Sequence, residues 1–323
     1  MKMTRWLKNL LGAVVIILLL WYLARHWDSL RGFVHLSPAT IVYLYLVSTV
    51  GGVVGSYTIQ HLLASFGIKP KFWEMFNLNN TTTLLNYLPA KFGTIYRANY
   101  LKRHYGLIYA HFGVIFLYLV LLMTMAASLI GLIVLITVYG LSKSETLLLA
   151  MIFAVTLVLF AFISFMPLPK RFLAADGRSG KFSSALRNFA VGRAQMTANK
   201  PALFVNMLLT AGCFLISSVR LGIIYHSMGQ NVHPAGYLVL GAVAYVTMFI
   251  GITPGSLGPR ELAGAFGSVA LGVDFNVGLL AFAIDRAVAM VWCFTIGLVS
   301  AVYMWYKSPQ DFKTAVPPAQ NPE

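Results

Sequence analysis

Long apolar runs dominate the pattern of hydrophobic and polar positions along this chain. A helix that rises about 1.5 Å per residue needs about 20 apolar residues to cross a hydrocarbon core about 30 Å thick. The runs do not alternate with polar positions, as the strands of a membrane β-barrel would. The pattern therefore predicts an all-α, polytopic helical membrane protein. The runs are Leu10–Leu23, Val114–Thr137, Thr146–Leu168, Phe204–Val219, Tyr237–Ile252 and Asn276–Tyr306.

Full spans are expected at six places. The chain starts like a signal peptide, but no small-x-small cleavage site follows at residues 21–25, so we expect a retained first span. The run at residues 235–252 is either a seventh span or the first arm of a re-entrant hairpin, so the total is about six to eight. The six expected spans cover residues 7–25, 38–66, 107–139, 146–168, 201–225 and 275–306.

Two segments, Lys71–Tyr105 and Gly251–Gly272, place polar residues and helix breakers between apolar runs. At the centre of each, a proline is followed four residues later by a glycine, in Leu88–Gly93 and in Thr253–Gly258. Paired interruptions in the two halves of a chain are typical of transporter sites built from broken helices. Broken or re-entrant helices without repeat symmetry are the alternative.

Residues 1–306 are expected to form a single transmembrane domain. If the two interrupted segments correspond, this domain contains half-repeats at residues 38–168 and 201–306, related as an inverted repeat. Residues 307–323 are predicted to be a disordered cytoplasmic tail.

The composition agrees with a membrane protein. Hydrophobic residues make up 59% and charged residues 10% of the chain, whereas about one quarter of a soluble domain is charged. The net charge of +15 reflects Lys and Arg in loops such as residues 170–200, which the positive-inside rule places in the cytoplasm with both termini. We therefore expect a cell inner (cytoplasmic) membrane, where membrane lipids are partners. Because no basic soluble face exists, nucleic acid is not an expected partner.

Motifs of catalysis and cofactor binding are missing from the sequence. Cys213 and Cys293 lie inside apolar runs without a CxxC or Cys/His spacing, so neither a metal site nor a cofactor is expected. No GxSxG, HExxH or Walker A motif is present. The sequence argues against an ATP-driven pump unless a partner supplies the motor.

The second interrupted segment carries the most informative polar residues. Its glycines permit unusual turns, and Pro259 suits the first position of a new helix with an arginine and a glutamate in its first turn. One interpretation is a pocket for an anionic head group, with the arginine as its cation; the other is a tight loop with solvated charges. The candidate binding residues are Pro254, Gly255, Gly258, Arg260 and Glu261.

Three charged residues lie inside the fifth and the last expected span, where such groups are costly and usually face a partner or a wet cavity. They are Arg220 in the fifth span and Asp285 with Arg286 in the last. The sequence suggests the pairs Glu261–Arg220, Asp285–Arg286 and Asp285–Arg260. These residues belong either to a substrate path or to ion pairs that only lock helices together.

In the first half, Lys91 and Arg97 frame the matching break. They are candidates for contact with a lipid phosphate, because the planar fork of an arginine can bind two oxygens.

The two interrupted segments together resemble the lysylphosphatidylglycerol synthase transmembrane-region family, which includes the flippase half of bacterial multiple peptide resistance proteins. The resemblance covers about residues 5–305. It is carried by Asn80–Thr83, Leu88–Gly93 and Arg97 with a P-G-x-x-G-x-x-E pattern that begins at Pro254 and ends at Glu261. The soluble aminoacyl-transferase domain of the full-length synthases does not follow the last span, so lysyl transfer by this chain alone is not expected.

The resemblance implies a non-enzymatic lipid translocase for an anionic or aminoacylated phospholipid or a polyprenyl-linked lipid. The alternatives are a non-transporting accessory protein or enzyme in envelope glycolipid assembly, which would serve a partner transferase, and a purely structural scaffold.

Overall fold

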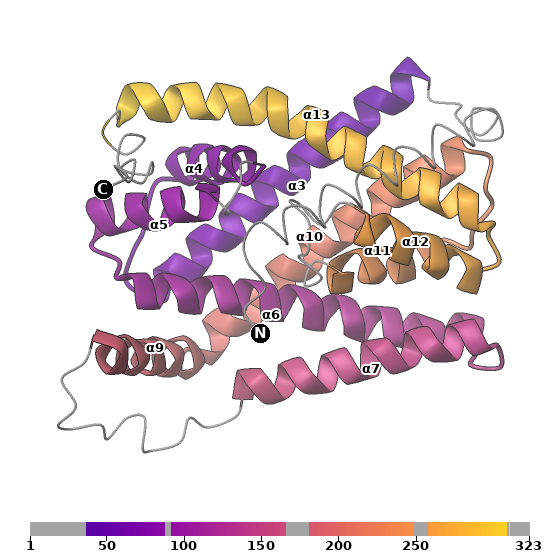
Figure 1. The fold of residues 1–323 in the computed structure, drawn as a ribbon, viewed down its shortest axis with the longest axis horizontal. Helices are drawn as coiled ribbons and strands as arrows, with labels where there is room; N and C mark the ends of the chain where they lie inside the picture. The colour runs from indigo at the N-terminus through magenta and orange to yellow at the C-terminus, as the bar shows by residue number, and fades with distance from the viewer. Residues whose placement is uncertain (1–36, 88–91, 166–180, 248–257, 309, 311–323) are drawn as a thin grey trace, which may run out of the picture. The chain divides into compact units, whose positions relative to one another are not determined.

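The computed structural model describes residues 37–87, 92–165, 181–247, 258–308 and 310. Every regular element in this part of the chain is a helix (Figure 1). In chain order the helices are α3 (Pro38–Ala64), α4 (Phe72–Leu85), α5 (Phe92–Tyr105), α6 (Tyr109–Val134), the π-helical turn η3 (Leu135–Tyr139), α7 (Ser144–Phe165), α9 (Lys181–Ala198), α10 (Lys200–Ser227), α11 (Gly236–Val246), α12 (Pro259–Ala270) and α13 (Phe275–Lys307).

Five helices in the described part are long and apolar enough to cross a membrane: α3, α6 with η3, α7, α10 and α13. Each coincides with one of the predicted spans, so the all-α, polytopic membrane fold is confirmed. The sixth predicted span, at residues 7–25, lies outside the described residues. The described part of the run at residues 235–252 forms the shorter apolar helix α11, whose length suits the arm of a hairpin better than a full span.

The chain forms two compact units, each made of three separate segments. Unit 1 comprises residues 1–55, 120–166 and 207–291, and unit 2 comprises residues 56–119, 167–206 and 292–323. Each unit contains one pair of short helices packed against each other, α11 with α12 in unit 1 and α4 with α5 in unit 2. In both pairs, the predicted break falls between the two helices. The half-repeats at residues 38–168 and 201–306 stay a prediction.

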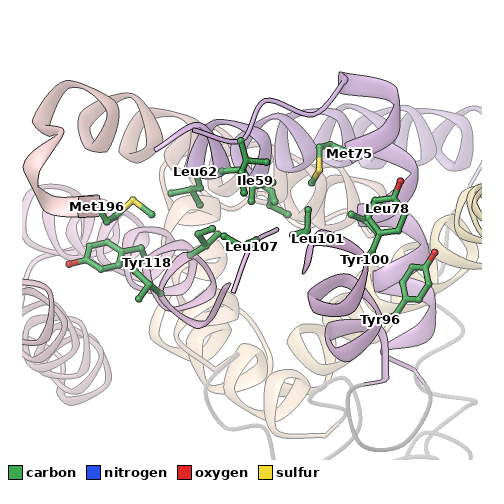
Figure 2. Close-up of a cluster of buried hydrophobic side chains, with 14 of the residues drawn as sticks. Ile59, Leu62, Met75, Leu78, Tyr96, Tyr100, Leu101, Leu107, Tyr118 and Met196 are labelled. Carbon is green, nitrogen blue, oxygen red and sulfur yellow. The ribbon is translucent and has the colours of Figure 1, made fainter. Parts of the chain in front are cut away.

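In unit 2, the short helices pack into a core that also draws on α3, α6, α9 and α13 (Figure 2). The tyrosines Tyr96 and Tyr100 of α5 and Met75 and Leu78 of α4 are fully buried in this core. Gly93 brings the two helices together, because a Cβ at this position would overlap the carbonyl oxygen of Thr82. Glycine therefore sets the spacing of the α4–α5 pair.

Unit 1 has two clusters of buried apolar side chains, one around α10 and α13 and one around η3, α7 and α11. α12 lies against α11 and α7. It is also close to α13, because Gly264 leaves room for the ring of Phe282. This packing fixes the start of α12 and the middle of α13, which hold the polar residues described next.

Much of the outer surface of the long helices is apolar. On α7, for example, Val155, Val158 and Phe162 are all more than half exposed. Exposed apolar surface on this scale marks a membrane-facing protein.

Candidate functional site

An ionic cluster lies inside unit 1 at a single buried carboxylate, that of Asp285 on α13. Arg220 of α10 donates two hydrogen bonds to it, from Nε to Oδ1 at 2.6 Å and from Nη2 to Oδ2 at 3.2 Å. Arg260, in the first turn of α12, donates a third from Nη2 to Oδ2 at 2.9 Å. Asp285 is 1% exposed, and the two arginine side chains are 13% and 16% exposed. Three helices therefore meet at one carboxylate.

The third nitrogen of the Arg220 guanidinium has a neutral partner. Its Nη1 donates to Ser48 Oγ on α3 at 3.3 Å. Arg220 is thus bound on all of its nitrogens, whereas Arg260 makes one hydrogen bond to the same acid. Arg220 is therefore the more firmly held of the two, and we call it the anchor. Arg260 is the arginine that can leave Asp285 more easily.

Glu261 does not contribute its charge to this cluster as a partner of Arg220. Its Oε2 accepts a 2.6 Å hydrogen bond from the backbone N–H of Gly258, so the side chain caps the start of its own helix. Gly258 has φ 92°, a conformation that side-chain-bearing residues rarely adopt. The predicted Glu261–Arg220 pair is wrong, because Gly258 folds the chain so that the carboxylate meets a local donor first.

The second carboxylate oxygen of Glu261 can still accept a hydrogen bond. The side chain is 1% exposed, and its Oε1 has no hydrogen-bond partner among the described residues. Arg286, next to Asp285 in α13, is half-buried and adds a third guanidinium to this part of unit 1. The predicted Asp285–Arg260 pair is present. Among the described residues of this cluster, the guanidinium groups of Arg220, Arg260 and Arg286 stand beside the carboxylates of Asp285 and Glu261.

A second polar cluster lies in unit 2, around Arg97 of α5. Arg97 is 8% exposed; its Nε donates to Thr82 Oγ1 at 3.1 Å and its Nη2 to Asn79 Oδ1 at 2.8 Å. Both partners are neutral residues of α4. Burial lowers the pKa of Arg97 to about 10, so the side chain is still charged at neutral pH.

Three predicted site residues, Lys91, Pro254 and Gly255, lie outside the described residues. The others fall into two groups, one in each unit. Arg220, Gly258, Arg260, Glu261, Asp285 and Arg286 belong to unit 1, and Arg97 belongs to unit 2.

The sequence did not point to Glu74, the acid at the start of α4. Its Oε1 accepts hydrogen bonds from Tyr100 at 2.8 Å and Tyr105 at 2.7 Å, and its Oε2 pairs with Lys307 Nζ at 3.0 Å. This carboxylate ties α4 and α5 to the end of α13 within unit 2. The available signal was an isolated acid in a strongly basic stretch.

No group of three or more His, Cys, Asp or Glu that could hold a metal ion occurs among the residues described. The unit 1 cluster combines guanidinium groups with carboxylates, and the unit 2 cluster combines a guanidinium with neutral hydrogen-bonding side chains. Guanidinium groups bind anions such as phosphate.

Comparison with known proteins gives one clear result. Residues 9–297 match the family described as "lysylphosphatidylglycerol synthase TM region". A search of curated proteins finds no match. Since the matched residues make up most of the chain and include both short-helix pairs, the protein is a multi-pass membrane protein that belongs to the lysylphosphatidylglycerol synthase transmembrane-region family.

Proposed function

We propose that the protein is a non-enzymatic lipid translocase, flippase-like, of the bacterial cytoplasmic membrane, with both termini in the cytoplasm. The observation that carries the proposal is the buried cluster of Arg220, Arg260 and Asp285, in which two guanidinium groups share one carboxylate. Ionisable groups inside membrane helices are costly and mark substrate paths. Family membership agrees with transport of a lipid.

The two arginines have different roles in the proposed transport cycle. Arg220 stays on Asp285 through two bonds and on Ser48 through a third. Arg260 exchanges its single bond to Asp285 for the phosphate of a lipid head group, and returns to Asp285 when the lipid leaves. Asp285 thus compensates Arg260 between transport cycles, so that the empty site does not hold an unpaired charge in a low-dielectric interior.

The acyl chains remain in the bilayer while the head group passes the ionic cluster. Alternating exposure comes from movement of the two halves of the domain against each other, as in transporters built from broken helices. No covalent bond is made or broken, and the chain needs no cofactor.

The test is lipid translocation in proteoliposomes that contain fluorescent phosphatidylglycerol, its lysyl ester or a polyprenyl-phosphate analogue. Purified protein should accelerate the movement of at least one lipid over protein-free liposomes. Arg260→Gln should abolish most of this movement, while Lys143→Gln, which removes the same charge from an exposed residue of unit 1, should leave it unchanged.

Absence of movement of all three lipids by folded protein would reject translocation. It would leave the accessory role in glycolipid assembly beside a partner transferase as the better explanation. Equal loss of transport in Arg260→Gln and Lys143→Gln would reject the ionic cluster as the site.

A further inference from the structure

Unit 2 contains a buried positive charge that the structure does not compensate. Arg97 is 8% exposed, and in the described part of the chain its hydrogen-bond partners are the neutral side chains of Thr82 and Asn79. A buried charge without a counter-ion costs several kcal/mol by order of magnitude. An anionic ligand that binds here would supply the missing charge and offset this cost.

The surrounding residues supply no acid. Glu74 is the one acidic residue among the described residues of unit 2. It is occupied by Lys307, Tyr100 and Tyr105. Within the part of unit 2 that the structure describes, Arg97 therefore has no carboxylate to exchange with, whereas Arg260 has Asp285.

Unsatisfied neutral groups lie on the same turn of α4. Asn80 is 1% exposed, and neither Nδ2 nor Oδ1 of its amide has a partner in the part of the chain that the structure describes. The hydroxyl of Thr81 is likewise buried without a partner there. Buried polar atoms are nearly always satisfied in native proteins, so this turn offers hydrogen bonds that the described residues do not use.

We propose that Arg97, with the amide and hydroxyl groups of Asn79, Asn80 and Thr82, forms a second head-group site that accepts a phosphodiester of net negative charge and rejects its aminoacylated, cationic ester. The inference rests on the proposed function for the presence of a lipid, and it names the class of lipid. Asn79 and Thr82 hold the guanidinium in place, and its remaining N–H groups bind the phosphate oxygens. The amide of Asn80 binds a hydroxyl group next to the phosphate.

Selection against the cationic ester follows from the same residues. A lysyl ester adds two ammonium groups, and an ammonium in a buried site needs a carboxylate partner. No acid of unit 2 that the structure describes is free to provide one, and Arg97 itself repels the added charge. The anionic lipid gains an ion pair at this site, whereas the cationic ester brings charges that stay unpaired.

The experiment is a thermal-unfolding titration of the full chain in dodecylmaltoside micelles. The additives are phosphatidylglycerol, lysyl-phosphatidylglycerol, phosphatidylcholine and, as the soluble source of the same anion, inorganic phosphate. Phosphatidylglycerol should raise Tm in a saturable way with an affinity at least about tenfold higher than that of the lysyl ester, a difference of about 1.4 kcal/mol. A response to inorganic phosphate equal to that to phosphatidylglycerol would identify a free-anion site and overturn the lipid assignment.

Three variants decide the role of Arg97. Arg97→Gln removes the charge but keeps an amide donor, so the lipid-free Tm should stay equal or rise while the shift caused by phosphatidylglycerol falls at least about tenfold in affinity. Arg97→Lys should keep part of the shift. Arg103→Gln, an exposed arginine on the same helix, should keep all of it.

A fall in the lipid-free Tm of Arg97→Gln would show that Arg97 only holds the α4–α5 pair together, and would overturn the inference. An equal shift for the lysyl ester would overturn the selectivity. The two proposals can fail separately. If phosphatidylglycerol causes a Tm shift that depends on Arg97 but no lipid is transported, the translocase alone is rejected. If lipid is transported but no such Tm shift occurs, this site alone is rejected.

Discussion

Asp285→Asn should be among the most destabilising single substitutions in unit 1. The carboxylate is 1% exposed and accepts three hydrogen bonds from two arginines. Removing one partner of a buried ion pair leaves the other charge uncompensated and costs about 3–5 kcal/mol. Because two guanidinium groups depend on this one carboxylate, we expect the upper part of that range.

The structure also predicts how much of the stability lost in Asp285→Asn comes from each of the two arginines. A hydrogen bond between charged groups contributes about 1.5–3 kcal/mol. Arg220 makes two such bonds to Asp285, and Arg260 makes one. In double-mutant cycles with Asp285→Asn, the coupling energy with Arg220→Gln should be about 3 kcal/mol or more. The coupling with Arg260→Gln should be about half as large.

The assay is equilibrium unfolding from dodecylmaltoside micelles by increasing mole fraction of dodecyl sulfate, followed by circular dichroism. Asp274→Asn is the matched control, because this exposed residue also loses a charge but keeps an oxygen for the backbone N–H groups of Asn276 and Val277; its cost should be a few tenths of a kcal/mol. A cost below about 1 kcal/mol for Asp285→Asn, or a larger coupling with Arg260 than with Arg220, would refute the assignment of anchor and exchanging arginine.

Three further outcomes follow from single contacts. Gly93→Ala should cost about 1–3 kcal/mol in the same unfolding assay, because the added methyl group would overlap the carbonyl oxygen of Thr82 and force α5 away from α4. Gly258→Ala should cost a similar amount, about 1–3 kcal/mol, through backbone strain at φ 92°, and it should lower transport along with stability. Partial burial alone would raise the pKa of Glu74, but hydrogen bonds from Tyr105, Tyr100 and Lys307 outweigh it and leave the pKa below its ordinary value. The stabilisation by Glu74 is therefore present at pH 7 and lost as pH falls through that lowered pKa. Wild type and Glu74→Gln should differ in Tm at pH 7 and converge once the pH is below it; a constant difference would contradict this.

The spans could be predicted closely from the sequence because the bilayer imposes one dominant requirement on them. The expected span at residues 201–225 is α10, Lys200–Ser227, and the expected span at residues 275–306 is α13, Phe275–Lys307. Hydrocarbon thickness fixes the length, and the cost of unpaired backbone groups fixes the helix. Neither argument depends on how the helices pack against each other, so both can be applied to a single sequence.

The partner of Arg220 could not be predicted in the same way, because it depends on how α10 is rotated relative to α13. Small residues set how α12 packs on α13, since Gly264 admits the ring of Phe282 and the Cβ that Gly278 lacks would overlap Ser268. The hydroxyl of Tyr225 on α10 shares a 2.6 Å hydrogen bond with the same Ser268, so the position of α10 also depends on α12. Hydrophobic periodicity gives little help in a helix that is apolar all round. The sequence therefore identified Asp285 as a residue in need of a partner but not the arginine that holds it most tightly.

A scaffold held together by buried ion pairs would give each buried arginine an acid of its own, since removing either partner of such a pair is costly. Unit 1 does not give each buried arginine its own acid, because Arg220 and Arg260 share Asp285 while Glu261 caps its own helix. Unit 2 departs further, since Arg97 is held by neutral oxygens alone in the described residues. Helix packing gains nothing from these excess charges, whereas an anionic head group that enters and leaves requires them. The shortage of acids beside buried arginines therefore favours a lipid-handling protein over a purely structural one.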